Sequence, residues 1–325
     1  MESNSPFKYA LMSMVNVNGF KTEKPTFFAM IGARMQGFDK KGPVTHEDLA
    51  EFFAAKGQDY KPGTMTFEDF VIWAKEAGYD GVDMMATFMD LPGKEIKGIL
   101  DRHNMELVSI SLISSFCAAR TDEEMQAKIE EARHYIDMAA EAGAHYVLIN
   151  AASIVATPGI SRESSYQKMI YGLKACVEYA RTRNVTLSTE ALHTVQVPYC
   201  SIGEMKRIFD AVPELTYSHD TGNMLPMLED PVEALEALKG RTVFVHMKDL
   251  EYADRPGAYA DACGRKLALA VYGTGLVDFK AVMKKLKEIN YTGFITLESR
   301  STNPNDLRQG VKEDLIFFKN MEANL

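Results

Sequence analysis

Short apolar runs alternate along this chain with longer stretches of helical character. The apolar runs predict eight strands, at 7–15, 81–87, 107–113, 145–151, 185–190, 215–220, 243–248 and 293–298. The stretches between them predict helices at 66–77, 93–104, 122–142, 163–183, 201–211, 231–239, 277–289 and 306–321. Near-continuous apolar runs of this length are typical of parallel strands that are covered on both faces.

Helix boundaries support this division. Ser201 is followed three residues later by Glu204, which is capping-box spacing, and the helix at 66–77 ends at Ala77-Gly78. Eight strands that are each followed by a helix predict an α/β fold, a (β/α)8 TIM barrel, with 1–325 as one barrel domain. The alternative is an open doubly wound sheet, which would usually carry a glycine-rich phosphate turn after its first strand. Residues 16–19 (NVNG) are a poor match to such a turn.

Two connections are too long to be simple turns, namely the loops after the first and seventh strands, at 18–64 and 250–275. Both are expected at the C-terminal face of the barrel, where active sites are built. The loop at 18–64 contains a predicted short helix at 46–56 and an unusual number of aromatic and methionine residues: Phe20, Phe27, Phe28, Met30, Met35 and Phe38. We expect it to overhang the barrel mouth as a lid, as part of an apolar ligand pocket or as a dock for a partner, the alternative being a decorative insertion.

Composition narrows the class of protein. A formal net charge of -9 argues against nucleic acid or an anionic membrane as a partner. No signal peptide and no membrane span are expected. The four cysteines are scattered without a CxxC pair, as in reduced, mostly buried thiols of a cytoplasmic protein: Cys117, Cys176, Cys200 and Cys263.

Four consecutive predicted strands each end in a residue that can bind a metal. They are Glu190, Asp220, His246 and Glu298. Taken singly, each has a structural explanation, such as a salt bridge or a hydrogen bond. Taken together at equivalent heights in a barrel, the carboxylates would repel one another strongly without a cation. The set suits a divalent ion with oxygen-rich coordination, Mn²⁺ or Mg²⁺ before zinc.

Neighbouring polar residues complete the candidate site. His193 and Asn223 follow Glu190 and Asp220 by three residues and are expected at the rim, where they can bind substrate hydroxyls. Lys248 lies on the same face as His246 and can steady a developing oxyanion, the alternative being an ion pair with Asp249 or another rim carboxylate. Two further residues are Arg300, a rim candidate for substrate binding, and His219, which strand alternation turns away from the site.

At these positions the chain resembles the xylose-isomerase-like barrels, the sugar phosphate isomerase/epimerase family. The matching segments are STEAL (188–192), DTGN (220–223), VHMKD (245–249) and ITLES (295–299). The resemblance implies that Glu190 and Glu298 are both metal ligands and proton-transfer groups. Two departures from the family pattern, Gln196 in place of a glutamate and Asn223 in place of a histidine, argue against simple ketose C3 epimerisation.

A narrower resemblance is to the large subunits of bacterial C-glycoside deglycosidases, through FKYALMSMVNVNGF (7–20) and the long first loop. It implies a Mn²⁺ enzyme that acts with a small β-rich second subunit in a hetero-oligomer. The expected reaction is elimination from a 3-oxo-C-glucoside, which breaks a carbon–carbon bond and releases an aryl aglycone. The sugar ketone would come from a separate oxidoreductase, since no dinucleotide site is visible.

Three other functions stay open at this stage. A monosaccharide isomerase or epimerase would begin with the same proton abstraction beside a sugar ketone. Hydrolysis of abasic DNA would need more rim histidines and basic loops, which this acidic chain lacks. A non-enzymatic sugar-binding protein would have no need for the carboxylate cluster.

Overall fold

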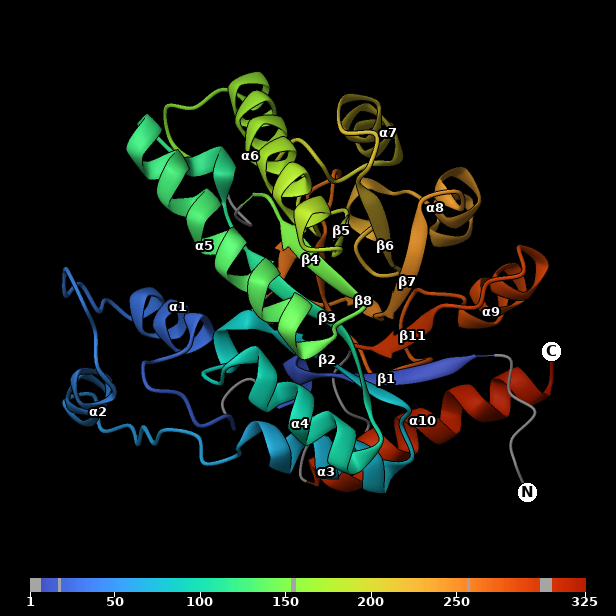
Figure 1. Ribbon diagram of the computed structural model, residues 1–325, viewed down its shortest axis with the longest axis horizontal. Helices are drawn as coiled ribbons and strands as arrows, with labels where there is room; N and C mark the ends of the chain where they lie inside the picture. Colours follow the sequence, from blue (N-terminus) through green and yellow to red (C-terminus); the bar gives the residue numbers. More distant parts are fainter. Residues whose placement is uncertain (1–6, 17–18, 153–155, 256–257, 299–305) are drawn as a thin grey trace.

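The barrel is closed by eight parallel strands. The computed structural model describes residues 7–16, 19–152, 156–255, 258–298 and 306–325. The order around the barrel is β1-β11-β7-β6-β5-β4-β3-β2 (Figure 1). The strands are β1 (Lys8–Met12), β2 (Gly81–Met85), β3 (Glu106–Ile113), β4 (Tyr146–Asn150), β5 (Thr186–Thr189), β6 (Thr216–Asp220), β7 (Thr242–Met247) and β11 (Phe294–Leu297). All eight overlap the predicted runs, so the (β/α)8 barrel is confirmed and the open sheet is excluded.

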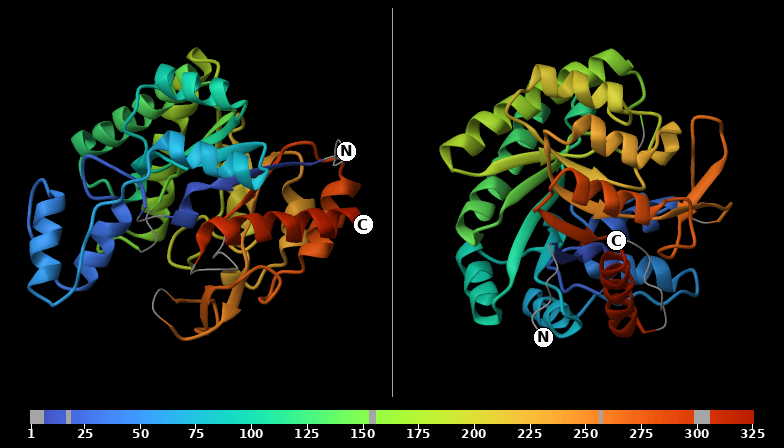
Figure 2. Two further views of the ribbon diagram at one scale, coloured as in Figure 1. Left: turned by 90° about the horizontal axis from the view of Figure 1, so that it is seen from below. Right: turned by 90° about the vertical axis from the view of Figure 1, so that its right-hand side faces the viewer.

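A ring of helices covers the outside of the barrel (Figures 1 and 2). They are α3 (Phe67–Ala77), α4 (Gly93–His103), α5 (Asp122–Ala142), α6 (Arg162–Thr182), α7 (Ile202–Ala211), α8 (Pro231–Leu238), α9 (Phe279–Glu288) and α10 (Leu307–Ala323). The predicted boundaries hold because the caps form. The Ser201 hydroxyl accepts from the Glu204 amide, and Gly78 ends α3 with φ at 97°. The helices bury their apolar faces against the strands, and this layer forms the main core.

The first insertion folds into a small unit of its own. It contains α1 (Phe27–Met35), which the sequence pattern missed, and α2 (His46–Ala54), which it predicted. A separate apolar cluster centred on Ala33, Phe38 and Leu49 holds the two helices together. They project from one side of the barrel (Figures 1 and 2). The chain leaves and returns at one place, because Met65 N donates to Gly19 O and Lys21 N donates to Met65 O.

The second insertion forms a three-stranded antiparallel sheet. Its strands are β8 (Leu250–Tyr252), β9 (Tyr259–Ala260) and β10 (Lys266–Leu269), in the order β8-β10-β9. The buried Asp249 carboxylate anchors both ends, accepting from the backbone amides of Leu250, Gly273, Gly275 and Val277. The insertion is therefore tied firmly to the end of β7, beside the barrel mouth.

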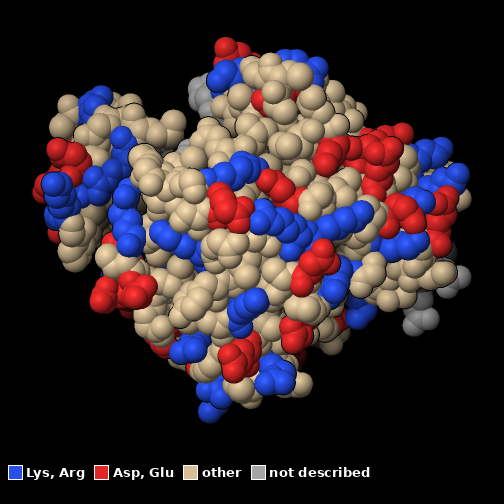
Figure 3. Space-filling view, turned by 90° about the horizontal axis from the view of Figure 1, so that it is seen from above, with Lys and Arg blue, Asp and Glu red and all other residues tan. Residues whose placement is uncertain are grey.

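Three general features agree with the composition. None of the described helices has both the length and the apolarity that a membrane crossing requires. Acidic and basic side chains are interspersed over the face seen in Figure 3. All four cysteines are free, and Cys263 is the exposed one.

Candidate metal centre and active site

The four predicted ligands meet at the C-terminal end of the barrel. Asp220 and His246 are direct partners in the β6–β7 register. Ligand atoms of Glu190, Asp220 and His246 lie within 4.8 Å of one another. His246 Nδ1 is 3.2 Å from Glu190 Oε2 and 3.1 Å from Glu298 Oε2. Parallel strands in register thus bring together the groups that the sequence placed at equivalent heights.

The donor set fits a divalent cation. Three carboxylates and one imidazole converge, and hard oxygen donors with one nitrogen suit Mn²⁺, Mg²⁺ or Zn²⁺. Glu190 Oε2 and His246 Nδ1 are buried, and neither has a hydrogen-bond partner within the described residues. Neighbouring groups hold the other carboxylate atoms in place. Asn150 Nδ2 donates to Glu190 Oε1, and the amides of Gly222 and Asn223 donate to Asp220 Oδ1.

Lys248 is the cation that faces these carboxylates. Its Nζ lies 2.6 Å from Asp220 Oδ2 and 2.9 Å from Glu298 Oε1. Burial would lower the pKa of Lys248, but Asp220 and Glu298 raise it well above its usual value. Burial raises the pKa of Asp220 to about 6 against the effect of Lys248. Burial also opposes ionisation of Glu298, but Lys248 and His246 lower the pKa of Glu298 to about 2.

Three further residues considered from the sequence are Lys248, His219 and Arg300. Lys248 pairs with rim carboxylates, as its alternative interpretation allowed, but not with Asp249, whose oxygens accept from backbone amides. His219 is fully buried outside the ligand cluster, beside Tyr217. Arg300 lies outside the described residues, so its predicted role in substrate binding stays a prediction.

A cavity of about 320 Å³ opens above the cluster. His193, Asn223 and Lys248 line it together with Glu190, His246 and Glu298. Its other wall is apolar and comprises Met12, Met14, Met85, Ile113, Leu148, Leu192, Tyr259 and Leu269, among others. The site therefore combines a charged floor with a large apolar wall.

The described part of the first insertion does not supply that wall. No described residue that lines the cavity belongs to 18–64, so the described part of this loop forms no part of the pocket. Its expected roles as a lid or a partner dock stay predictions. Phe20 instead stacks on Phe88 with ring centroids 4.8 Å apart, and Met35 is 78% exposed. The remaining aromatic side chains of known position pack within the insertion's own cluster. The second insertion reaches the cavity through Tyr259 and Leu269.

His193 lines the cavity, and its expected role in binding substrate hydroxyls stays a prediction. Its ring centroid lies 4.7 Å from that of Tyr259. Burial and the Lys248 ammonium lower the pKa of His193 to about 4. The imidazole is therefore neutral near pH 7 and can both accept and donate a hydrogen bond.

Sequence reasoning missed Asp83 in β2 and Asn150 at the end of β4. Asp83 is fully buried, and its Oδ2 lies 3.1 Å from His246 Nε2. The available signal was an acidic residue in the middle of the apolar run 81–87, where an unpartnered carboxylate would be costly to bury. Asn150 reaches Glu190, as described above, and no motif distinguishes it in the sequence.

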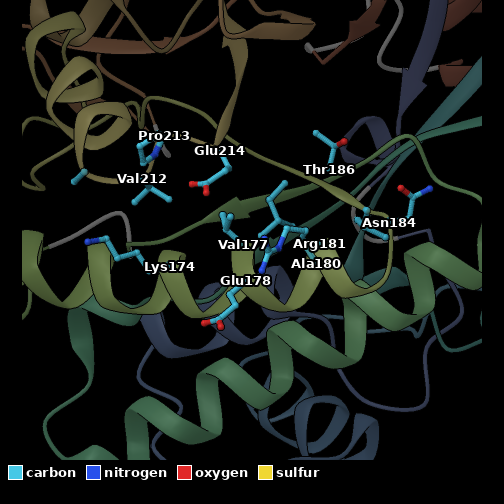
Figure 4. A pocket seen from close by; sticks show the side chains of 13 residues that line it. Lys174, Val177, Glu178, Ala180, Arg181, Asn184, Thr186, Val212, Pro213 and Glu214 are labelled. Carbon is cyan, nitrogen blue, oxygen red and sulfur yellow. The ribbon is translucent and has the colours of Figure 1, made fainter.

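A larger cavity, of about 650 Å³, lies at the opposite end of the barrel. Lys174, Glu178, Arg181 and Glu214 line it along α6 and the turn before β6 (Figure 4). Its residue Thr186 begins β5, roughly 13 Å of strand before Glu190. This groove of mixed charge is remote from the ligand cluster.

Known proteins resemble this chain in sequence and in fold. An inosose dehydratase from Lacticaseibacillus casei is 22% identical over 249 residues, which cover 72% of this chain and 82% of that protein. D-Allulose 3-epimerase from Methylomonas sp., solved with D-allulose, superposes with a TM-score of 0.66 at 19% identity, covering 99% of each chain.

Two further solved structures are similar over most of their length. The Escherichia coli 3-keto-D-glucoside 4-epimerase YcjR has a TM-score of 0.62 at 16% identity, covering 79% of this chain and 95% of its own. The IOLI protein, solved with a zinc atom, has a TM-score of 0.63 at 16% identity, covering 80% and 94%. Residues 71–321 match the family described as xylose isomerase-like TIM barrel, and the chain belongs to that family.

Proposed function

We propose that this chain is a divalent-metal-dependent carbon–carbon lyase, the large subunit of a C-glycoside deglycosidase that cleaves a 3-oxo-C-glucoside. One observation carries the proposal: the cluster of Glu190, Asp220, His246 and Glu298 shares its cavity with a wall of methionine, leucine and tyrosine side chains. A substrate with a polar ketone-bearing ring and an apolar aryl group matches both parts.

The polar floor suits proton abstraction beside a ketone. A bound Mn²⁺ would supply Lewis acidity, which acidifies the C–H next to the carbonyl. A glutamate, Glu190 or Glu298, takes that proton from C2 of the sugar. The Lys248 ammonium faces the same space and can stabilise negative charge that develops on the C3 oxygen. Asn223 and neutral His193 can bind ring hydroxyls.

Elimination then balances without an oxidant. The C2–H electron pair forms the C1=C2 double bond, and the bond between C1 and the aglycone carbon breaks. Its electrons leave with the aglycone carbon, which takes up a proton. The products are the free aglycone and an unsaturated keto sugar, and the ketone itself must come from a separate oxidation.

Incubation of the purified chain with Mn²⁺ and an aryl 3-oxo-C-glucoside is the direct test. We expect free aglycone and the unsaturated keto sugar in equal amounts by mass-detected chromatography, at full rate only with a small second polypeptide. The same C-glucoside without the 3-oxo group serves as the control and should not react. Absence of aglycone release in every combination, with turnover of D-allulose or an inosose instead, would contradict the lyase assignment.

A sugar isomerase or epimerase is the second candidate. Two matched structures favour it, since their names describe a D-allulose 3-epimerase and a 3-keto-D-glucoside 4-epimerase. The name of the inosose dehydratase describes an elimination instead. Dehydration and epimerisation beside a ketone begin with the same proton abstraction, and the second acid and the cavity walls decide the outcome. The apolar wall is the feature that a free monosaccharide leaves largely unused.

The first insertion is proposed as the dock for the second subunit, since it projects from the barrel. Excision of residues 24–62 with a short glycine-serine linker should preserve the fold, because Gly19 and Met65 already lie side by side. We expect metal affinity to be unchanged and association with the second polypeptide to be lost, both measured on the purified chain by calorimetry.

A substitution in the second insertion gives the matched comparison. Leu269→Ser makes the cavity wall more polar and should raise the KM for the aryl substrate. Association with the second polypeptide should be unchanged. Unchanged association after the excision would show that the first insertion is not the docking site.

A further inference from the structure

We propose that Asp83 is a positioning residue that fixes the tautomer and the ring orientation of His246, so that Nδ1 is presented to the metal. This inference rests on the metal site proposed above. Asp83 lies in the middle of β2, between Val82 and Met84, and none of its surface is exposed. His246 lies in β7, two barrel positions beyond β1, so the contact crosses the barrel interior.

The Asp83 carboxylate is held rigidly. Its Oδ1 accepts from the Ser109 hydroxyl at 2.6 Å and from Ser111 at 3.4 Å. Its Oδ2 accepts from the Thr296 hydroxyl at 3.3 Å and lies 3.1 Å from His246 Nε2. Two strands, β3 and β11, thus supply three hydroxyl donors to one buried carboxylate. Such a network leaves the group little rotational freedom and keeps it available as an acceptor.

An acceptor at this point determines which nitrogen of His246 carries the proton. A neutral imidazole has one N–H and one lone pair. With Nε2–H donating to Asp83, the lone pair belongs to Nδ1, which lies between Glu190 Oε2 and Glu298 Oε2. Nδ1 has no hydrogen-bond partner within the described part of the chain. Histidine ligands are commonly oriented by a carboxylate on the other ring nitrogen, which also raises their basicity.

The contact has a competing explanation as a plain ion pair between Asp83 and a protonated His246. In that case Asp83 would stabilise the fold and compete with metal binding. Removal of Asp83 would then leave metal affinity unchanged or raise it. The two explanations therefore predict different signs for one measurable quantity.

The test is Mn²⁺ affinity of Asp83→Asn, measured by calorimetric titration and compared with wild type. Asparagine retains the shape but cannot satisfy both the serine hydroxyls and Nε2–H as an acceptor. We expect affinity to fall about 10–100-fold. The absorption bands of the Co²⁺-substituted protein should shift as well, because the geometry at the ion changes. Unchanged or higher affinity with an unchanged spectrum would overturn the proposal.

Three further variants keep the test decisive. Thr296→Val removes one hydroxyl donor to Asp83 with little change of volume, and we expect a smaller loss of affinity in a protein that still folds. Glu322→Gln removes a buried carboxylate that accepts from Tyr9, remote from the site, and should leave Mn²⁺ affinity unchanged. In a His246→Ala background, Asp83→Asn should have no further effect. An equal loss in that background would show that Asp83 acts directly through its charge.

Failure of the inference is distinguishable from failure of the proposed site. If wild-type protein binds no divalent ion, the metal site itself is wrong. If wild type binds one ion and both the Asp83→Asn and Thr296→Val variants bind it equally well, only the role of Asp83 is wrong.

Discussion

A chain in which alanine replaces all four predicted ligands should bind no divalent cation and should have no measurable activity. The replaced residues are Glu190, Asp220, His246 and Glu298. Lewis-acid stabilisation of a developing oxyanion is worth several kcal/mol, so we expect a loss of roughly 10³-fold or more in rate. Element analysis of the purified protein measures the ion, and chelation followed by addition of Mn²⁺, Mg²⁺ or Zn²⁺ to wild type identifies which metal restores activity.

The control for this variant concerns Lys248. The change removes both carboxylates that pair with its ammonium, and a buried unpaired charge is costly. A second variant that also carries Lys248→Met separates unfolding from loss of the ion, with circular dichroism as the check on the fold. Retention of one equivalent of metal by either folded variant would contradict the ligand assignment.

The barrel could be predicted because the sequence signals for its strands and helices are local and recur along the chain. Each strand is a short apolar run, and helix ends such as Ser201 and Gly78 carry caps that depend only on near neighbours. Parallel connectivity then follows from the alternation of strand and helix. The four candidate ligands could be picked out for the same reason, since each lies at or next to the end of its strand.

Features that depend on contacts between residues far apart in the sequence could not be predicted from the sequence. The α1 helix is held by a cluster that includes Leu49 of α2, and the ends of the second insertion's sheet are anchored by the Asp249 carboxylate. Asp83 gives no periodic signal, and its partner His246 lies 163 residues away in the sequence. The aromatic residues of 18–64 were predicted to line the mouth because apolar residues in a loop indicate a buried surface. Phe38 packs instead in the insertion's own cluster, and Phe20 packs against Phe88 in the main core.

The two glutamates at the site should differ in role. Lys248 Nζ lies 2.9 Å from Glu298 Oε1, and this ammonium makes Glu298 a weaker base. Glu190 Oε1 instead accepts from the neutral Asn150 amide, and its Oε2 lies 3.2 Å from His246 Nδ1. We therefore expect Glu190→Gln to slow solvent-deuterium exchange at the carbon next to the ketone by about 10²–10⁴-fold, the range for loss of a general base. Glu298→Gln should slow exchange less and weaken metal binding more. Proton NMR in D₂O measures the exchange, and calorimetry measures the affinity.

The comparison needs a glutamate of similar type outside the site. Glu106→Gln supplies it, because Glu106 pairs with Lys8 and His145 at the opposite end of the barrel. That variant should exchange deuterium at the wild-type rate. A larger loss in Glu298→Gln than in Glu190→Gln would assign the base to Glu298. Exchange at the wild-type rate in both site variants would remove both glutamates from proton abstraction and leave His193, whose neutral imidazole lines the same cavity, as the base.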